Sequence, residues 1–299
     1  MLPYPERFTA HLERVHMIRA TGVALPARWF EVEAQLRAFS ELRSTAAQRF
    51  AEQIVNPQKG VDVLALRAHA IAEASDTFGA QAEVQGAVIA AVEREMLAAW
   101  KPEAMNVYRA VAKLYDEAAQ QFTTAANTCD PESSAEHMID ASDDQRQAWK
   151  LAEVSAARLT QLVPGLISSA QLTETVRLDS ADERLAQPWW SAPIDPTAEL
   201  PLVCDPKALH RRRVWLAFDH VGGRTGKWGR LTSLGCTLRA HDLNSFEKYR
   251  LPLPIKHEQR QVLGALRGVV QMVSTDPEDA DYRSDVETIT PLRESGAFA

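Results

Sequence analysis

The chain has 299 residues, of which 45% are hydrophobic, and a formal net charge of −7 at pH 7. This length and apolar content suffice for one large or two ordinary globular domains with buried cores. The acidic balance argues against a protein that coats nucleic acid along its whole length, although it sets no limit on local basic patches.

Cysteine content and targeting patterns bear on the compartment. Cys129, Cys204 and Cys236 are far apart and odd in number, so a reducing compartment is expected. The first residues lack the layout of a signal peptide, and no apolar run approaches the length of a membrane span, so no membrane contact is expected. Arginine outnumbers lysine 25 to 8 and alanine reaches 46, usage that suggests a GC-rich genome such as that of an actinobacterium or one of its phages. We therefore expect a cytoplasmic location, or the virion if the gene belongs to a phage.

Residues 1–170 hold 35 alanines and 5 glycines, a composition that favours helix. Apolar residues recur there at the 3.6-residue period of helices. The first helix is expected to end before Gly22 and the second near 56–60. Two interleaved seven-residue series over 61–98 predict a third helix about 57 Å long.

Two further helices complete the predicted bundle. The fourth begins at Pro102, a residue suited to a first turn. The fifth begins after Ser133 or Ser134, which form a capping-box pattern with Glu136, and it ends at Pro164–Gly165.

The connections between these helices are short, so neighbours should be antiparallel. We predict a mainly α fold, with an elongated antiparallel Ala-rich helical bundle over 1–170, followed by an extended Pro-rich arm and a small irregular α+β region. Alanine and serine at the seams allow helix axes to approach closely but bury little apolar area, so the bundle is expected to oligomerise.

The segment 171–206 is the predicted arm. Five prolines within 186–206 have a spacing that opposes helix and favours an extended path. Trp189 and Trp190 lie among these prolines and would be costly to expose. They are predicted to be interface anchors, on the bundle or on a neighbouring subunit.

Residues 207–273 are the predicted small basic α+β region. Val214, Leu216 and Phe218 alternate in RRVWLAFD, which indicates a strand, and 230–240 is a weaker strand candidate. A helix is predicted at about 256–273. The stretch VGGRTGKWGR between the two strands is predicted to be a hairpin-like loop whose glycines take positive φ. It fails the P-loop pattern, since Val221 replaces the first glycine and Trp228 the final hydroxyl residue, so no nucleotide cofactor is expected.

Charge divides the C-terminal part of the chain in two. Residues 207–267 contain 13 basic and four acidic residues, a net charge of +9, whereas the acidic C-terminal tail, 274–299, has a net charge of −5. We predict that Arg224, Lys227 and Arg230 of the loop meet carboxylates supplied by protein, for which the tail is one source, and that Trp228 is a further interface residue. The alternative is nucleic-acid binding, in which Arg211, Arg212 and Arg213 contact phosphates while Trp215 and Trp228 stack on bases.

Catalytic patterns are sparse. The helical ExxH pair Glu13–His16 lacks the second pair and the extra glutamates of a di-metal bundle, and Cys236 is best interpreted as a buried thiol. We predict a non-enzymatic structural or assembly protein, for which a phage particle from a GC-rich host is a natural setting. Its expected partners are its own copies and other structural proteins, without metal or cofactor. The alternatives are a nucleic-acid-binding protein and an enzyme with a site between the bundle and the C-terminal region.

Overall fold

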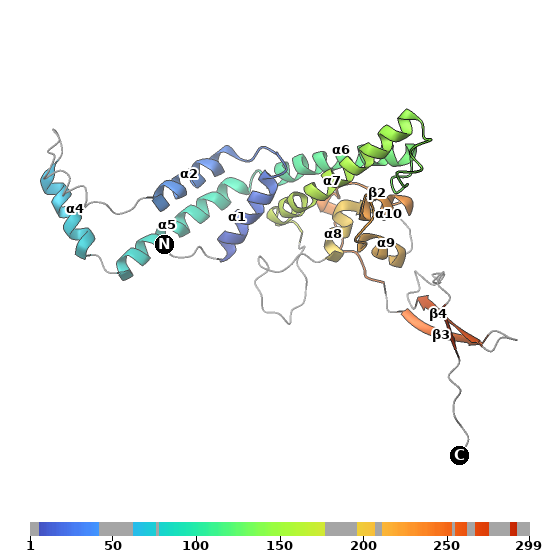
Figure 1. The fold of residues 1–299 in the computed structure, drawn as a ribbon. Helices are drawn as coiled ribbons and strands as arrows, with labels where there is room; N and C mark the ends of the chain where they lie inside the picture. Colours follow the sequence, from blue (N-terminus) through green and yellow to red (C-terminus); the bar gives the residue numbers. More distant parts are fainter. Residues whose placement is uncertain are drawn as a thin grey trace, which may run out of the picture.

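The computed structural model describes residues 6–41, 62–75, 78–176, 196–206, 211–252, 255–261, 267–274 and 288–291. The fold is mainly helical with a small irregular α+β region, as predicted (Figure 1). The described helices are α1 (Glu6–Arg19), α2 (Ala27–Glu41), α4 (Val63–Ser75), α5 (Phe78–Trp100), α6 (Ala104–Thr128), α7 (Asp143–Leu172), α8 (Pro196–Val203), α9 (Arg211–Phe218) and α10 (Lys227–Ser233), with a 3-10 turn η1 (Leu243–Ser245). The described strands are β1 (Cys204–Asp205), β2 (Thr237–Leu238), β3 (Ile255–Gln261), β4 (Arg267–Ser274) and β5 (Thr288–Pro291).

Helices α6 and α7 lie side by side at the centre of the molecule, with α1 against the second half of α7 and α2 against α5 (Figure 1). Small side chains are prominent among the buried positions of this pair, which allows the helix axes to approach closely. The predicted alanine seam is therefore confirmed. The buried alanines of the two helices include Ala118, Ala119 and Ala125 in α6 and Ala148, Ala152 and Ala156 in α7. None of the described helices is both long and apolar enough to cross a membrane.

Helix α7 begins later than predicted. Its N-cap is Ser142, whose side chain accepts a hydrogen bond from the Gln145 backbone while the Gln145 side chain accepts one from the Ser142 backbone. This is a complete capping box. Residues 135–139 form turns instead. Serine followed three residues later by a Glu or Gln occurs at both places, so the local pattern alone could not select the start.

Helix α7 also continues through Pro164–Gly165 to Leu172, where the sequence predicted a stop. Proline removes one backbone hydrogen bond. Burial of Leu162, Leu166 and other apolar residues on both sides of it keeps the helix continuous. A Cβ atom on Gly165 would overlap the Thr21 methyl group and lie 3.2 Å from the Met17 carbonyl oxygen, so α7 packs closely against α1 and the residues just after it at this glycine.

The single long helix predicted over 61–98 is two helices, α4 and α5. The residues of the seven-residue series lie in different surroundings in the two helices. Ile89 and Met96 of α5 are buried, whereas Leu64 of α4 is 76% exposed. Figure 1 shows α4 lying apart from the α6–α7 pair, beyond the end of α5.

The predicted extended arm ends in a helix, because residues 196–203 form α8. Pro196 occupies the first turn, where no backbone donor is needed. Pro201 cannot donate to the carbonyl of Thr197, and the backbone N–H of Tyr249 donates to that carbonyl instead, at 2.7 Å. This tertiary hydrogen bond and the burial of Leu200 and Leu202 offset the proline penalty.

The strand predicted at RRVWLAFD is helix α9. Val214, Ala217 and Phe218 are buried, which is helical spacing, and Leu216 is 55% exposed. In the second predicted strand, 230–233 belong to α10 and only Thr237–Leu238 pair with β1, with Cys204 opposite Leu238. The glycine loop therefore joins two helices and is not a hairpin turn.

The helix predicted at 256–273 is replaced by the antiparallel strands β3 and β4, with Ile255 opposite Ser274 and Gln261 opposite Gly268. Strand β5 of the acidic tail pairs with β4. Valines at 269, 270 and 273 favour strand over helix because their branched side chains pack well on a pleated surface. The described residues of the tail are Ser274, the last residue of β4, and those of β5.

Candidate functional site

The structure places the predicted interface residues in different surroundings. Trp189 and Trp190 lie outside the described residues. Trp228 is 1% exposed, donates its Nε1–H to the Thr160 hydroxyl at 2.9 Å, and packs edge-on against Tyr115. This position corrects the interface assignment, since Trp228 belongs to the chain's own core and not to an exposed contact.

Arg224 fixes the glycine loop to α7. Its guanidinium lies 3.4 Å from the centre of the Trp149 ring, donates to the Trp149 carbonyl at 2.7 Å and pairs with Glu153 at 2.7 Å. Three kinds of contact to one helix leave this side chain 15% exposed. The guanidinium therefore serves the fold of its own chain.

The glycine loop also encloses a carboxylate. Glu132 accepts hydrogen bonds from the backbone N–H groups of Arg224 and Thr225, at 2.9 and 2.8 Å, and from the Thr225 hydroxyl. Burial opposes the charge, but these hydrogen bonds outweigh it and lower the pKa of Glu132. Gly223 has φ +77°, and a Cβ atom there would lie 2.6 Å from Glu132 Oε2, so the loop needs glycine both for its backbone and for this close approach.

Lys227 pairs with Glu199 of α8 at 2.7 Å and lies 4.1 Å from the centre of the Phe218 ring. Arg224 and Lys227 therefore pair with carboxylates of their own chain, and their predicted role at an interface stays a prediction. Within the described residues these carboxylates belong to Glu153 and Glu199, and the acidic residues of the tail lie outside the described part of the chain. Arg230 is exposed on α10 and forms no ion pair with a described residue.

The three consecutive arginines do not present one basic surface. Arg212 is 8% exposed, Arg211 is half-buried and Arg213 is exposed. Successive residues of a helix point about 100° apart, so α9 directs the three side chains to different surroundings. The three arginines therefore share no common face with which to contact neighbouring phosphates, as the nucleic-acid alternative would require.

The residues considered for metal binding and nucleophilic chemistry do not form such a site among the described residues. Glu13 and His16 are both exposed on α1. Within the described part of the chain, no group of three His, Cys, Asp or Glu side chains is placed to hold a metal ion. Cys204 and Cys236 are buried free thiols, and a hydrogen bond of the protonated Cys204 thiol to Cys236, together with burial, raises the pKa of Cys204.

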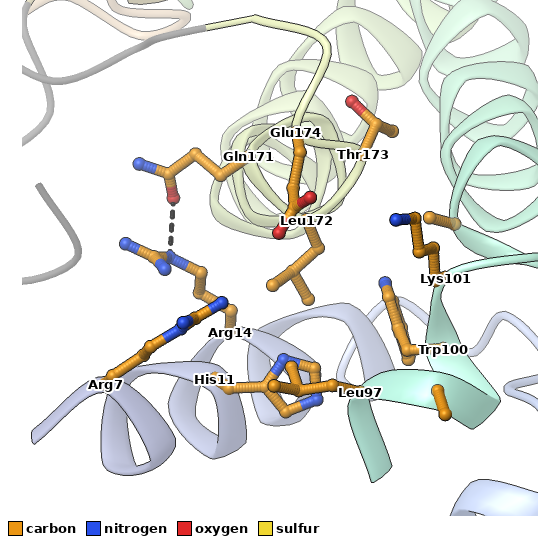
Figure 2. Close-up of a pocket in the computed structure, with 12 residues that line it drawn as sticks. Arg7, His11, Arg14, Leu97, Trp100, Lys101, Gln171, Leu172, Thr173 and Glu174 are labelled. Atoms are coloured by element: carbon orange, nitrogen blue, oxygen red, sulfur yellow. Dashed lines mark hydrogen bonds between the residues drawn. The ribbon is translucent and has the colours of Figure 1, made fainter. Parts of the chain in front are cut away.

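A cavity of about 300 Å³ lies where α1, α5 and the end of α7 meet. Figure 2 shows Arg7, His11 and Arg14 projecting from α1 on one side, with Gln171 and Leu172 of α7 and the next two residues, Thr173 and Glu174, on the other. The third wall comes from the end of α5 and the first residue of α6. Its lining residues there are Leu97, Ala98, Trp100, Lys101 and Ala104.

His11, in the wall formed by α1, is neutral. Its Nε2 accepts a hydrogen bond from Trp29 Nε1–H at 3.2 Å, which places the ring proton on Nδ1. Burial, with smaller contributions from Arg14 and Arg7, lowers the pKa of His11 to about 4. Neither His11 Nδ1–H nor Trp100 Nε1–H, on rings packed edge-to-face, finds a hydrogen-bond partner among the described residues.

The end of α7 completes the cavity. Gln171 accepts from Arg14 Nε at 3.0 Å, which orients that guanidinium (Figure 2). Glu174 has φ +58°, the only positive value among the described residues other than glycine. Glycine or asparagine is the usual residue after a helix in this conformation, so a glutamate there carries backbone strain beside the cavity.

The sequence did not reveal this cavity. Arg7, His11 and Arg14 follow the spacing of one helix face, a signal that was present, but Lys101 and Glu174 join them only through the fold. Comparisons with protein-family models, with curated proteins and with solved structures gave no match to this chain.

Proposed function

We propose that this chain is a non-enzymatic structural protein that self-associates, and that α4 is the surface through which two copies meet. The observation behind this proposal is the exposure of Leu64 and Ile71, at 76% and 54%. The two residues are seven apart, with Ala68 between them, so the three share one helix face.

The composition of α4 supports a helical partner. Its 13 residues contain only Arg67 and Glu73 as charged residues besides His69, and none of its described side chains is buried. An isolated helix of this length is marginally stable in water, so packing must supply most of its stability. A narrow stripe with alanine at its centre suits the close approach of another helix.

A second copy of the chain is the occupant that fits this stripe best. In a two-fold antiparallel pair of α4 helices, Leu64 of each copy faces Ile71 of the other, and Ala68 lies near the axis. The near absence of charge on α4 selects neither an acidic nor a basic partner. The phage particle is the proposed setting on residue usage alone.

Light scattering of the full chain tests the proposal. The wild type should have a mass at least twice that of the 33.2 kDa chain, and the Leu64→Glu/Ile71→Glu variant should have the monomer mass. Val221→Glu is the matched control, because Val221 is 96% exposed in a loop, and it should behave as the wild type. A monomeric wild type, or a double variant of unchanged mass, would contradict self-association through α4.

The nucleic-acid alternative has a separate outcome in the same measurement. A mass increase only with DNA, lost as salt is raised, would favour it. The internal pairing of Arg224, Lys227 and Arg239 with carboxylates leaves fewer cations of the basic region for phosphates, which favours the structural proposal.

A further inference from the structure

We propose that the cavity between α1, α5 and the end of α7 binds a small organic anion. One carboxylate or phosphate head group would lie among Arg7, Arg14 and Lys101, and an apolar body would pack against Leu97, Trp100 and Leu172. This ligand site is independent of self-association through α4.

The charges around the cavity favour an anion. Arg7 and Arg14 lie on one face of α1 with the neutral His11 between them, and Lys101 faces them from the end of α5 (Figure 2). Like charges on one helix face repel, and Arg7 and Lys101 form no ion pair with a described residue. With Glu174 as the acidic residue of the lining, the cavity has a net charge of about +2.

Helix α6 adds to this preference. Its first residue, Ala104, lines the cavity, and the side chain of its N-cap residue, Glu103, forms no capping hydrogen bond. The N-terminus of a 25-residue helix has a partial positive charge and unpaired backbone N–H groups. Its field therefore acts in the same sense as that of the three cations.

Two buried donors indicate that an acceptor is missing from this wall. His11 and Trp100 are 3% and 2% exposed, and each has one N–H without a partner in the described chain. Nearly all buried polar groups in native proteins are hydrogen-bonded. A ligand oxygen at the inner end of the cavity would supply an acceptor for them.

Size and the remaining charge define the ligand class. A volume of about 300 Å³ is at the lower limit for small-molecule sites and suits a single aromatic or short aliphatic acid. Glu174 would repel a second anionic group. The ligand is therefore a compact molecule with one anionic head group.

Calorimetric titration of the full chain with benzoate, phenyl phosphate and benzamide tests the proposal. Benzoate or phenyl phosphate should bind at one site per chain, and the one that binds identifies the head group. Benzamide, the uncharged analogue of benzoate, should bind about tenfold more weakly than the anion. Equal affinity for benzamide and benzoate, or no saturable binding of either anion, would overturn the proposal.

Charge variants locate the binding. Arg7→Gln and Lys101→Gln should each weaken anion binding about threefold, whereas Lys113→Gln, an exposed lysine on α6 outside the cavity, should not change it. Glu174→Gln should strengthen binding, because it removes a repelling charge. All four positions are exposed, so circular dichroism should report unchanged helix content. An affinity that is the same in the Arg7→Gln/Lys101→Gln variant as in the wild type would place the ligand elsewhere and contradict the inference.

Discussion

The loop from Gly222 to Gly226 uses successive backbone N–H groups to bind an anion, as phosphate-binding loops do, but the anion is the carboxylate of Glu132. The side chain of Arg224, within the loop, forms an ion pair with α7, and that of Lys227, just after the loop, forms one with α8. The loop therefore joins the C-terminal region to the bundle. Its glycines serve this internal contact.

Alanine at Gly223 should destabilise the protein more than alanine at Gly235. Both positions have positive φ, +77° and +87°, so each substitution strains the backbone by about 1 kcal/mol. Only at Gly223 would the new Cβ also lie 2.6 Å from Glu132 Oε2, whereas no atom of the described residues lies within 4 Å at Gly235. Urea unfolding should show an additional loss of about 1 kcal/mol or more for Gly223→Ala.

A double-mutant cycle isolates the cause of that additional loss. In a Glu132→Ala background, Gly223→Ala should cost no more than Gly235→Ala does, because the carboxylate that it meets is gone. An additional loss that persists in this background would show that the contact with Glu132 is not responsible.

The conformation of these glycines could be predicted from the sequence, but their partner could not. Clustered glycines indicate positive φ wherever they occur. Glu132 lies more than 90 positions earlier in the chain, in a turn before α7, and no local pattern links it to the loop. The prediction that a strand precedes the loop was wrong. Val214 and Phe218 are four residues apart, a spacing that puts them on one face of a strand and also on one face of a helix such as α9.

Among the elements, α7 shows most clearly how packing overrides local preference. Pro164 and Gly165 are both unfavourable within a helix, and together they predict a stop. The structure continues the helix because its last two turns bury Leu166, Ile167 and Ala170. Gly165 is needed there, since its missing side chain admits Thr21 of the segment after α1.

Gly165→Ala and Gly86→Ala should therefore change stability in opposite directions. Alanine is a better helix former than glycine by about 1 kcal/mol, and a Cβ on Gly86 in α5 would meet no atom of the described residues within 4 Å, so Gly86→Ala should be neutral or stabilising. At Gly165 the overlap with Thr21 should outweigh that gain and give a net loss of about 1–3 kcal/mol. Thermal or urea unfolding measures both.

Thr21→Ser provides the rescue, because it removes the overlapping methyl group and keeps the hydroxyl that donates to the Ile18 carbonyl at 2.6 Å. The double variant should recover part of the stability lost in Gly165→Ala, the remainder reflecting the nearby Met17 carbonyl. If Gly165→Ala proved as stable as Gly86→Ala, the tight approach of α7 to α1 would be wrong.

At the scale of the whole molecule, composition predicted what depends on many residues together. Alanine-rich helical periodicity gave the mainly α fold and the alanine seam, because both follow from average properties of long segments. The cavity depends instead on three elements placing Arg7, Lys101 and Glu174 around it. The split of charge between a basic segment and an acidic remainder was visible in the sequence, but its consequence, pairing of Arg224 with Glu153 and Lys227 with Glu199, required the fold.

The junction of α1, α2 and α5 should make the stability of the whole chain sensitive to mild acid. The pKa of His11 is about 4 in the folded protein and 6.5 in the unfolded chain, because burial and the neighbouring Arg14 and Arg7 disfavour its charged form. Between these values the unfolded chain binds a proton that the folded chain does not. Lowering the pH therefore favours unfolding, while well above pH 6.5 the penalty is absent.

Between about pH 7 and pH 5, His11 should reduce the free energy of unfolding by about 2 kcal/mol, in a range where most carboxylates remain ionised. Urea unfolding at the two pH values measures this loss. His11→Gln keeps a side-chain acceptor for Trp29 but cannot titrate, so its stability should fall by about 2 kcal/mol less over the same range than that of the wild type. His16→Gln, at an exposed position of the same helix, should retain the loss due to His11. An equal pH dependence in the wild type and in His11→Gln would mean that His11 is not held neutral, and the donor that we assign to Nδ1 at the cavity wall would then have to be reassigned.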